Sequence, residues 1–347
     1  MLGFVMSDLS QERKPLRMVT CPGCGAKIFI PGDLPPLSIT ACTKCGFGLM
    51  MPMQLRQFEL RSAIASGGMG TVYRAFDVTL EREVAVKLMK KELADDPQAL
   101  ESFYREARAA AALNHTNIIH IYTFDDFEGQ LYLVMELADQ GSLDSRIEKE
   151  QTVPELDILD IGYKVASALD TALKHNLLHR DIKPGNILFN AEGEPKLVDF
   201  GLARKAEGAP DEEGAIWGTP YYIAPEKIKR EREDFLSDMY SLAGTLYHAL
   251  TGHVPFEAPS IEAVIAAHIH TPLTPPDQVL PGISAPTSDA LVRAMAKNPK
   301  ERFQTYDEFM MALTSARSLY LINLYKHQGQ AAPAAAHSSG GKSWWRR

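Results

Sequence analysis

The amino-acid sequence predicts an α+β protein with three parts: a small four-cysteine module, a strand-rich part with one main helix, and a helix-rich part. Three patterns carry this prediction. All four cysteines lie between Cys21 and Cys45. Strand-like alternation of apolar residues begins at Phe58 and returns at residues 83–89, whereas after Gly141 the apolar residues recur at helical spacing.

Composition and charge restrict the class of protein. Of the 347 residues, 45% are hydrophobic and 23% are charged, which is ordinary for a soluble globular protein. The net charge of −8 disfavours a general nucleic-acid-coating protein. No apolar run approaches the roughly 20 residues that cross a bilayer, and the N-terminal apolar stretch is too short for a signal peptide. We therefore expect a cytoplasmic protein without a transmembrane segment, in which residues 1–16 are flexible.

The cysteine spacing predicts a zinc ribbon over residues 17–53. Two Cys-x2-Cys pairs are each followed directly by a glycine, Gly25 or Gly46. Four thiolates suit tetrahedral Zn²⁺, and glycines with positive φ let backbone N–H groups turn towards the sulfurs. Two disulfides or a redox pair are the competing interpretations, which a reducing compartment disfavours. The expected zinc ligands are Cys21, Cys24, Cys42 and Cys45.

The strand-rich part contains three features that suit a phosphate site. The glycines of IASGGMGTVY, residues 64–73, let backbone N–H groups approach a phosphate, although glycine turns are common. Lys87 ends the alternation of VAVK, where a strand can aim an ammonium under that loop. On the helix that follows, Glu106 is either a solvated helix charge or the partner that orients Lys87.

Helical spacing dominates the second half of the chain. One helix face after Gly141 collects five apolar residues, and further helices are expected near residues 236–250 and 287–295. The five apolar residues are Ile158, Ile161, Val165, Leu169 and Ala172. From about Ala331 no core-building pattern is present, so we expect a disordered end. Contact of the terminal WWRR with a membrane surface is the less favoured alternative.

Two polar motifs lie between these helices. HRDIKPGNILF, residues 179–189, places an Arg, an Asp, a Lys and an Asn within eight residues, on a segment bounded by Pro and Gly. These polar side chains are too many for a buried strand, and they are too closely spaced to lie on one face of a helix. VDFGLA, residues 198–203, then places Asp199 directly after an apolar strand.

Taken in order, these motifs resemble the Hanks-type (eukaryotic-like) protein kinases. Their residues, in particular GGMGTVY and HRDIKPGNIL, are most similar to those of the bacterial Ser/Thr kinases. The matching set is the glycine-rich loop, VAVK, the helix Glu, HRDIKPGN, DFG, and APE at residues 224–226. The resemblance implies a two-lobed protein kinase domain over residues 57–316, with a β-rich N-lobe at about 57–137 and a helical C-lobe at about 142–316. Residues 317–347 would form a C-terminal extension. One position departs from the family, because Ala65 stands where its first glycine usually lies.

The resemblance also implies catalytic roles. Asp181 would accept or orient the proton of the substrate hydroxyl, and Lys183 would steady the γ-phosphoryl group. Asn186 and Asp199 would hold Mg²⁺ (or Mn²⁺), a hard cation that suits oxygen donors. Lys87 would contact the α- and β-phosphates of ATP and be held by Glu106, completing the catalytic set Lys87, Glu106, Asp181 and Lys183.

Nucleotide binding and structural support are implied in the same way. Val72, Ala85 and Leu188 would enclose the adenine, Met135 would be the gatekeeper, and the backbone of the hinge that begins at Glu136 would pair with the adenine edge. The expected ATP-binding residues are Ile64, Ala65, Ser66, Gly67, Gly68, Met69, Gly70, Thr71, Val72, Ala85, Lys87, Met135, Glu136, Leu137 and Leu188. The expected structural supports are Asp238 and an ion pair of Arg302 with Glu226.

These residues favour an active Ser/Thr kinase that phosphorylates protein substrates in signalling. Lys183 and Thr219 both resemble the Ser/Thr enzymes rather than the Tyr kinases. The alternative is a pseudokinase-like scaffold that uses the zinc ribbon to recruit partners, although every phosphate, metal and hydroxyl ligand is present. A nucleic-acid-binding role for the ribbon is disfavoured by its few aromatic residues, so we expect a protein partner and no specific nucleic acid.

The segment after DFG predicts an unusual mode of activation. Many kinases with an Arg before the catalytic Asp, as Arg180 is here, use a phosphorylated residue in this segment to pair with that Arg. Residues 202–218 contain no Ser, Thr or Tyr, but they include the carboxylates Asp211, Glu212 and Glu213. We therefore expect one of these carboxylates to pair with Arg180. The alternative is that they keep a mobile loop solvated.

Overall fold

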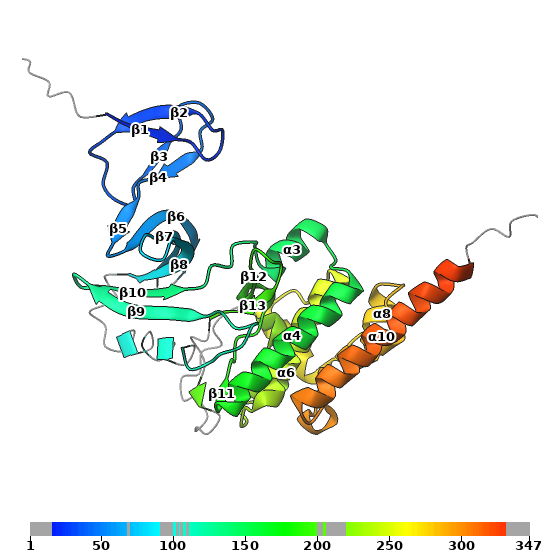
Figure 1. Ribbon diagram of the computed structural model, residues 1–347. Helices are drawn as coiled ribbons and strands as arrows, with labels where there is room; N and C mark the ends of the chain where they lie inside the picture. The colour runs from blue at the N-terminus through cyan, green and yellow to red at the C-terminus, as the bar shows by residue number, and fades with distance from the viewer. Residues whose placement is uncertain are drawn as a thin grey trace, which may run out of the picture. The chain divides into compact units, whose positions relative to one another are not determined.

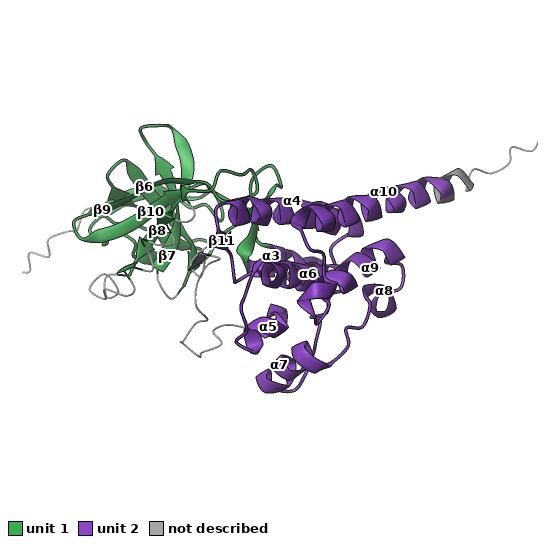
Figure 2. Ribbon diagram, turned by 90° about the horizontal axis from the view of Figure 1, so that it is seen from below, with its two compact units in different colours: residues 1–142, 186–204 green, residues 143–185, 205–347 purple. Residues whose placement is uncertain are grey.

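A computed structural model describes residues 16–67, 70–90, 111–199, 204–205 and 220–330, together with residues 100, 101, 104, 107 and 108 (Figure 1). The chain forms two compact units, Met1–Ser142 with Asn186–Arg204, and Leu143–Gly185 with Lys205–Arg347 (Figure 2). The first unit is built from strands and the second from helices. The predicted α+β fold, with a β-rich lobe and a helical lobe behind a cysteine module, is confirmed.

The cysteine module consists of two small antiparallel sheets. Strand β1 (Leu16–Thr20) pairs with β2 (Lys27–Pro31), and β3 (Ile39–Ala41) pairs with β4 (Gly48–Met50). Strand β2 alternates strictly between exposed and buried residues, as a strand with one covered face does. The core of the module is small and contains two of the four cysteines; its buried members are Cys21, Ile28, Ile30, Cys42, Leu49 and Met51.

A six-stranded sheet follows the module in the order β5-β6-β7-β8-β10-β9. Its strands are β5 (Met53–Leu55), β6 (Phe58–Ser66), β7 (Gly70–Asp77), β8 (Arg82–Met89), β9 (Ile121–Phe127) and β10 (Gln130–Met135). The sheet begins at Met53, within the range expected for the ribbon, because β5 pairs with β6 and buries Leu55 completely. Strand β6 begins at Phe58, where the strand-like alternation of the sequence begins, and β8 coincides with the alternating run at residues 83–89.

The two faces of this sheet carry different clusters. One face holds residues such as Val84, Val86 and Tyr132, against which Leu37 of the cysteine module also packs. The other face holds Met89 and Leu133, with Ala107 packed against them. A hairpin of β12 (Ile187–Phe189) and β13 (Pro195–Leu197) completes the described part of the unit. One face of the sheet therefore carries the larger apolar cluster, and the other carries a smaller apolar cluster together with Lys87, which lies two residues before Met89 on β8.

The second unit is helical and packs mainly around α4, α6, α9 and α10. Its longer helices are α3 (Leu143–Glu150), α4 (Glu155–Lys174), α6 (Phe235–Thr251), α7 (Ile261–His270), α9 (Ala285–Ala294) and α10 (Tyr306–Gln330). The single turns α5 (Pro225–Ile228) and α8 (Pro276–Val279), the short strand β11 (Leu177–Leu178) and the 3₁₀ turns Pro220–Tyr222 and Pro299–Glu301 complete it. The 3₁₀ turn Pro184–Asn186 and the short strand β14 (Arg204–Lys205) lie where the chain passes from one unit to the other. In the described ranges no helix is both long enough and apolar enough to span a membrane.

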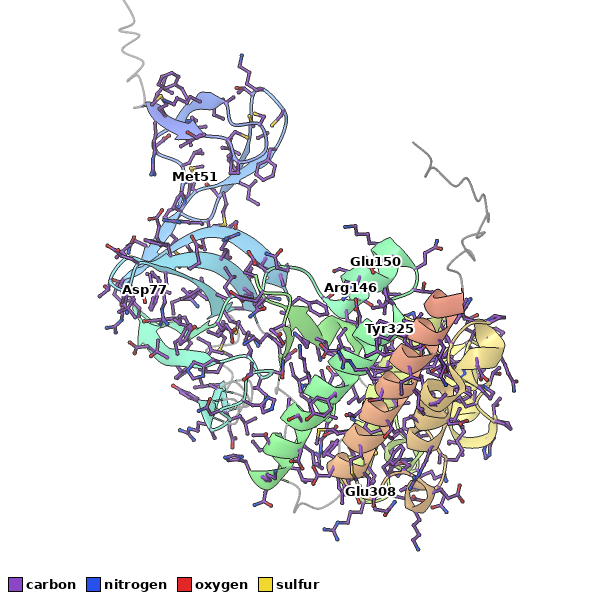
Figure 3. The ribbon with its side chains drawn as sticks, turned by 45° about the vertical axis from the view of Figure 1, so that its right-hand side comes forward. Met51, Asp77, Arg146, Glu150, Glu308 and Tyr325 are labelled. Atoms are coloured by element: carbon purple, nitrogen blue, oxygen red, sulfur yellow. The ribbon has the colours of Figure 1, made fainter. Side chains whose placement is uncertain are left out.

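Helix α4 is the predicted helix, and its five predicted apolar residues are all buried. Close packing around it depends on Gly162. A Cβ at this position would lie 2.8 Å from Leu246 Cδ1 of α6 and 3.1 Å from Leu313 Cδ1 of α10. Arg146 of α3, labelled in Figure 3, adds a polar link between the two helices. It donates to Asp157 of α4 at 3.0 Å.

Helix α10 continues beyond the expected end of the kinase domain at residue 316. Up to that point it is anchored by fully buried side chains such as Phe309 and Ala316. Beyond it, apolar residues are exposed, including Tyr325, which is 72% exposed (Figure 3). Part of the predicted C-terminal extension is therefore helical.

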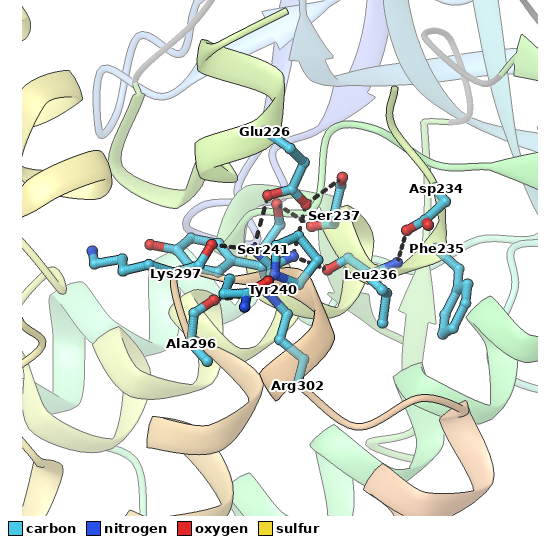
Figure 4. Close-up of polar contacts among 12 residues, drawn as sticks. Glu226, Asp234, Phe235, Leu236, Ser237, Tyr240, Ser241, Ala296, Lys297 and Arg302 are labelled. Carbon is cyan, nitrogen blue, oxygen red and sulfur yellow. Dashed lines mark hydrogen bonds and ion pairs between the residues drawn. The ribbon is translucent and has the colours of Figure 1, made fainter. Parts of the chain in front are cut away.

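A buried ion pair lies where α5 meets the start of α6 (Figure 4). The Arg302 guanidinium donates to both carboxylate oxygens of Glu226, at 2.7 and 2.8 Å, and the two residues are 1% and 4% exposed. Arg302 also donates to the carbonyls of Leu236 and Ala296, and Ser237 Oγ donates to Glu226. Burial alone raises the pKa of Glu226, but Arg302 lowers it overall. The predicted pair is confirmed.

Candidate active site and cysteine cluster

The strand register brings several predicted nucleotide residues to one face of the six-stranded sheet. Val72 of β7 lies opposite Lys87 of β8, and Ala85 of β8 lies opposite Met135 of β10. Directly opposed residues of antiparallel strands share a face, as do residues two apart on one strand. Val72, Ala85, Lys87 and Met135 therefore belong to the same face. Ala65, which stands where the resemblance would place the first glycine of the glycine-rich loop, pairs with Val72.

The glycine-rich turn joins β6 to β7. Residues 64–66 end β6, where Ser66 pairs with Thr71 and their hydroxyl oxygens lie 3.0 Å apart. The N–H of Gly67 donates to the carbonyl of Gly70 at 2.8 Å. A Cβ on Gly70 would lie 2.1 Å from a backbone oxygen of β8, so only glycine fits there.

Lys87 and Asp199 form the central charge pair of the strand-rich unit. Lys87 Nζ lies 3.7 Å from Asp199 Oδ1, with the side chains 15% and 50% exposed. Asp199 has φ 69°, a left-handed conformation that is uncommon for a residue with a side chain. Such backbone outliers concentrate at functional sites, where the surrounding structure maintains them.

Asn186 and the hinge lie on the same unit. Asn186 is 6% exposed, and its carbonyl accepts the N–H of Val198, next to Asp199. Residues 135–137, which end β10 and open the hinge, are each half-buried. Leu188 on β12 forms a bridge with Ser142, so the hairpin lies against the end of the hinge.

The loop that carries Asp181 in the helical unit is organised by short polar contacts. Lys183 Nζ donates to Asp181 Oδ2 at 2.7 Å, and these side chains are 40% and 29% exposed. Asp238 of α6, which is 3% exposed, accepts the N–H groups of His179 and Arg180 at 2.7 and 2.8 Å. A buried carboxylate that accepts two backbone donors fixes the path of the loop that carries Asp181. The expected structural role of Asp238 agrees with this geometry.

Arg180 is held at several points. Its φ is 68°, and its carbonyl accepts a hydrogen bond from Lys227 Nζ at 2.9 Å. Its guanidinium Nε lies 3.9 Å from Glu233 Oε2, with side chains that are 11% and 14% exposed. This separation is an ion pair and not a hydrogen bond. Because both groups are largely out of water, their attraction is stronger than that of a surface pair.

Comparison with known proteins identifies the family. The model of the protein kinase domain matches residues 58–313. The chain belongs to the protein kinase family. The serine/threonine-protein kinase PknB of Mycobacterium leprae is 36% identical over 76% of this chain and 43% of its own length. The serine/threonine-protein kinase PknE of Mycobacterium bovis is 36% identical over 76% of this chain and 46% of its own length. The chain thus spans less than half the length of these curated relatives.

The cysteine module lies outside the matched kinase domain, which begins at residue 58. Its two knuckles are alike: Gly25 and Gly46 have φ of 70° and 77°, and their N–H groups donate to the carbonyls of Cys21 and Cys42. The four sulfurs lie within 4.8 Å of one another. Cys21 Sγ is 3.7 Å from Cys45 Sγ, and Cys24 Sγ is 3.9 Å from Cys42 Sγ. Zn–S bonds of about 2.3 Å in a tetrahedron require an S–S separation of ~3.8 Å, whereas a disulfide requires about 2.05 Å.

The pKa values of two of the thiols are shifted in opposite directions. The backbone N–H groups of Lys44 and then Cys45 lower the pKa of Cys42 to about 6. At Cys45 the N–H of Phe47 acts in the same direction, but the neighbouring thiol of Cys24 and burial raise its pKa to about 12. A cation held between the sulfurs would favour the thiolate form at both positions.

Some predicted site residues lie outside the described residues. In the kinase domain these are Gly68, Met69, Glu106, Asp211, Glu212, Glu213 and Thr219. The same holds for the N-terminal segment up to residue 15 and for the tail that ends in WWRR. The expected Lys87–Glu106 pair, the loop carboxylates near Arg180 and the disordered end therefore stay predictions.

Sequence reasoning missed two charged residues near the site. Lys196 lies on β13, between two residues that are also buried, and Glu233 lies just before α6. The only sequence signal for Lys196 is a lysine inside the short apolar run that precedes DFG. Glu233 carries no such signal, because it belongs to the charged run KREREDF.

Proposed function

We propose that this chain is a serine/threonine protein kinase that transfers the γ-phosphate of ATP to Ser or Thr hydroxyls of protein substrates in signalling. The observation that carries the proposal is the placement of Asp181 beside Lys183 on a loop anchored by Asp238. Phosphoryl transfer requires a positioned hydroxyl and neutralised charge, with little covalent work by the protein. An anchored carboxylate next to an ammonium supplies both.

In this proposal each motif contributes one function. Asp181 orients the acceptor hydroxyl and takes its proton, and Lys183 stabilises negative charge on the transferring group. Lys87 binds the α- and β-phosphates, oriented by Glu106. Asn186 and Asp199 would hold Mg²⁺ or Mn²⁺, and their amide and carboxylate oxygens are the donors that such cations prefer. A bound divalent cation supplies neutralisation of the phosphate charge.

The remaining nucleotide residues complete the proposal. The glycine-rich turn, residues 64–71, covers the phosphates, and Val72, Ala85 and Leu188 enclose the adenine. Met135 is the gatekeeper, and the backbone at Glu136 and Leu137 pairs with the adenine edge. The support for this assignment is the shared sheet face of Val72, Ala85, Lys87 and Met135.

Autophosphorylation and peptide phosphorylation with labelled ATP and Mg²⁺ test this function. Asp199→Asn and Lys87→Met should each lower the rate by roughly 10²-fold or more, because an electrostatic clamp is lost. Asp181→Asn should be similarly inactive while it retains nucleotide binding. The matched control is Asp170→Asn, which changes a carboxylate on α4 that pairs with Lys174 at the surface. Undiminished transfer by Asp199→Asn would exclude the proposed chemistry.

The domain layout is proposed to consist of a zinc ribbon at about 17–53, a kinase domain at about 57–316 and a C-terminal extension. The sulfur separations support a structural Zn²⁺ bound by Cys21, Cys24, Cys42 and Cys45. A protein partner of the ribbon is proposed from its exposed apolar residues. Met18 and Phe29 are cross-strand partners that are 55% and 65% exposed.

Activation is proposed to need no phosphate on residues 202–218. The segment lacks hydroxyl side chains, and Glu233 already provides one carboxylate near Arg180. Kinetics of phosphatase-treated enzyme should show full activity without a lag. A triple variant, Asp211→Asn, Glu212→Gln and Glu213→Gln, and the single variant Glu233→Gln then separate the two sources of negative charge. A requirement for prior autophosphorylation would contradict the proposal.

A further inference from the structure

A buried ion pair joins the hinge to the hairpin that precedes Asp199. Lys196 Nζ lies 2.5 Å from Glu136 Oε1, and the two side chains are 9% and 19% exposed. Removing a lysine ammonium from water is costly unless a close counter-charge and further hydrogen bonds compensate. Both residues belong to the strand-rich unit. Removing one partner from a pair this well shielded should cost more than the fractions of a kcal/mol typical of surface pairs, because the other charge would be left nearly buried and unpaired.

Glu136 is fixed on a second side by the chain that leads into β9. Its Oε2 accepts the N–H of His120 at 3.3 Å, and its own N–H donates to the carbonyl of His120 at 2.8 Å. The carboxylate of Glu136 thus links three segments: the hinge, the start of β9 and the hairpin. Loss of the ammonium would leave a nearly buried carboxylate with one weak hydrogen bond.

The hairpin side of the pair leads directly to a residue of the proposed adenine site. Lys196 lies opposite Leu188 in the β12–β13 register. Further along the hinge, Gln140 donates its N–H to the carbonyl of Phe189, and Phe189 donates to the carbonyl of Gly141. Backbone hydrogen bonds therefore hold the far end of the hinge to β12, and the Lys196–Glu136 pair holds the near end to β13.

We propose that Lys196 is a positioning residue for adenine recognition, which deepens the proposed kinase function and rests on it. Lys196 sets the separation between the hinge backbone at Glu136 and Leu137, which pairs with the adenine edge, and Leu188, which covers the adenine plane. Its loss weakens binding of the base and leaves the phosphate-binding residues in place. The effect therefore falls on nucleotide affinity and base selectivity rather than on the rate of phosphoryl transfer.

Nucleotide binding by the full-length chain tests this proposal without requiring catalysis. The dissociation constants of MgATP, MgGTP and magnesium tripolyphosphate are measured by calorimetry for wild type and Lys196→Met. The expected result is an increase of roughly tenfold or more for MgATP, since displacement by about 1 Å is enough to disrupt a positioned site. The preference for ATP over GTP should shrink, and tripolyphosphate binding should stay within about twofold of wild type. In the kinase assay, KM for ATP should rise while kcat changes little.

Three variants control the experiment. Lys196→Arg keeps the charge and should retain the ATP preference. Lys174→Met removes a lysine that pairs with Asp170 at 2.6 Å but is 72% exposed, and it should bind every ligand as wild type does. If Lys196→Met fails to fold, the double variant Lys196→Met, Glu136→Gln removes the buried unpaired charge. The double variant should regain thermal stability but not base selectivity.

The outcomes separate the two proposals. Wild-type affinity and ATP preference in Lys196→Met, or in the double variant where the single one does not fold, would overturn the positioning role. A general loss of binding that includes tripolyphosphate would also overturn it, because that pattern indicates collapse of the whole unit. If wild type binds MgATP selectively but transfers no phosphate, the proposed activity fails and the role of Lys196 in base selectivity is still decided by the binding data.

Discussion

The cysteine module and the helical unit are stabilised in opposite ways. In the module, two of the buried core residues are themselves cysteines, and few apolar side chains accompany them. In the helical unit, α4 buries one apolar face, most of α6 is buried, and the Glu226–Arg302 pair is a polar insertion into this core. This difference predicts that a metal bound by the four thiols would create the fold of the module, whereas the ion pair adjusts a fold that apolar burial already supports in the helical unit.

Metal removal should have the largest effect and should be confined to the module. Structural Zn²⁺ contributes an apparent free energy on the order of 10 kcal/mol in small zinc domains, more than this core can replace. We expect about one zinc per chain by elemental analysis. Chelation, or Cys24→Ser, should abolish amide protection in β2 in hydrogen exchange.

Protection in α4 and α6 is the internal control for that measurement and should not change. A module that keeps its protected amides without metal, or that contains iron or disulfides, would contradict the view that bound zinc stabilises the module.

Breaking the buried pair should have the next largest effect. Arg302→Met leaves the Glu226 carboxylate buried without its main partner, so unfolding free energy should fall by about 3–5 kcal/mol. Urea denaturation followed by helical circular dichroism measures the change. The double variant Arg302→Met, Glu226→Gln should recover much of the loss, because no unpaired charge is left. Equal stability of wild type and Arg302→Met would show that the pair is dispensable.

A buried histidine should make the helical unit sensitive to acid. Burial, and then the charge of Lys297, lower the pKa of His268 to about 3 from an ordinary value of 6.5. Below pH 6.5 the unfolded chain binds a proton that the folded chain does not. Stability should therefore fall as pH decreases from about 6.5 towards 3, by at most ~1.4 kcal/mol per pH unit from this residue.

Thermal melts between pH 4 and 8 check this slope. His268→Gln, which can keep a polar contact with the Tyr240 hydroxyl that lies 2.8 Å from Nδ1, should flatten it. An unchanged slope in that variant would assign the acid sensitivity to other groups.

A surface pair should have the smallest effect. Lys174 is 72% exposed and pairs with Asp170 one turn earlier on α4 at 2.6 Å. Lys174→Ala should leave the unfolding free energy unchanged within the error of the measurement, because water screens the interaction. The same denaturation experiment measures it. A loss comparable to that of Arg302→Met would mean that burial does not set the importance of charges in this unit.

Local patterns predicted those elements whose residues face a core along their whole length. Helix α4 is one example, because its apolar residues at helical spacing all became buried. Helices α7 and α10 were not predicted. In α7 only Val264 and His268 are buried, and in α10 the buried residues end at Ala316, beyond which the apolar residues are exposed, so neither helix has a buried stripe along its whole length.

The candidate site likewise contains residues that the sequence indicates and contacts that it does not. The resemblance of the ordered motifs to the protein kinases is what points to Lys87, Asp181, Lys183, Asn186 and Asp199 as candidate site residues. The pairing of Lys196 with Glu136 was not predictable, because the two residues are distant in sequence and their contact depends on how the hairpin lies against the hinge. The same is true of Arg180 and Glu233.

The sequence by itself determined the class of each part, the order of the parts and the chemical types at the site. Periodicity, glycine positions and cysteine spacing are properties of short stretches of sequence. They therefore predict the local structure of each stretch but not its contacts with distant stretches. Apart from Arg302 with Glu226, which the family resemblance implied, only the tertiary structure decided which charges meet. Lys196 with Glu136, and Asp238 with the backbone of Arg180, come together through packing of distant segments. Burial then selects these pairs, because an ammonium or a carboxylate inside the protein is stable only where another segment supplies its partner.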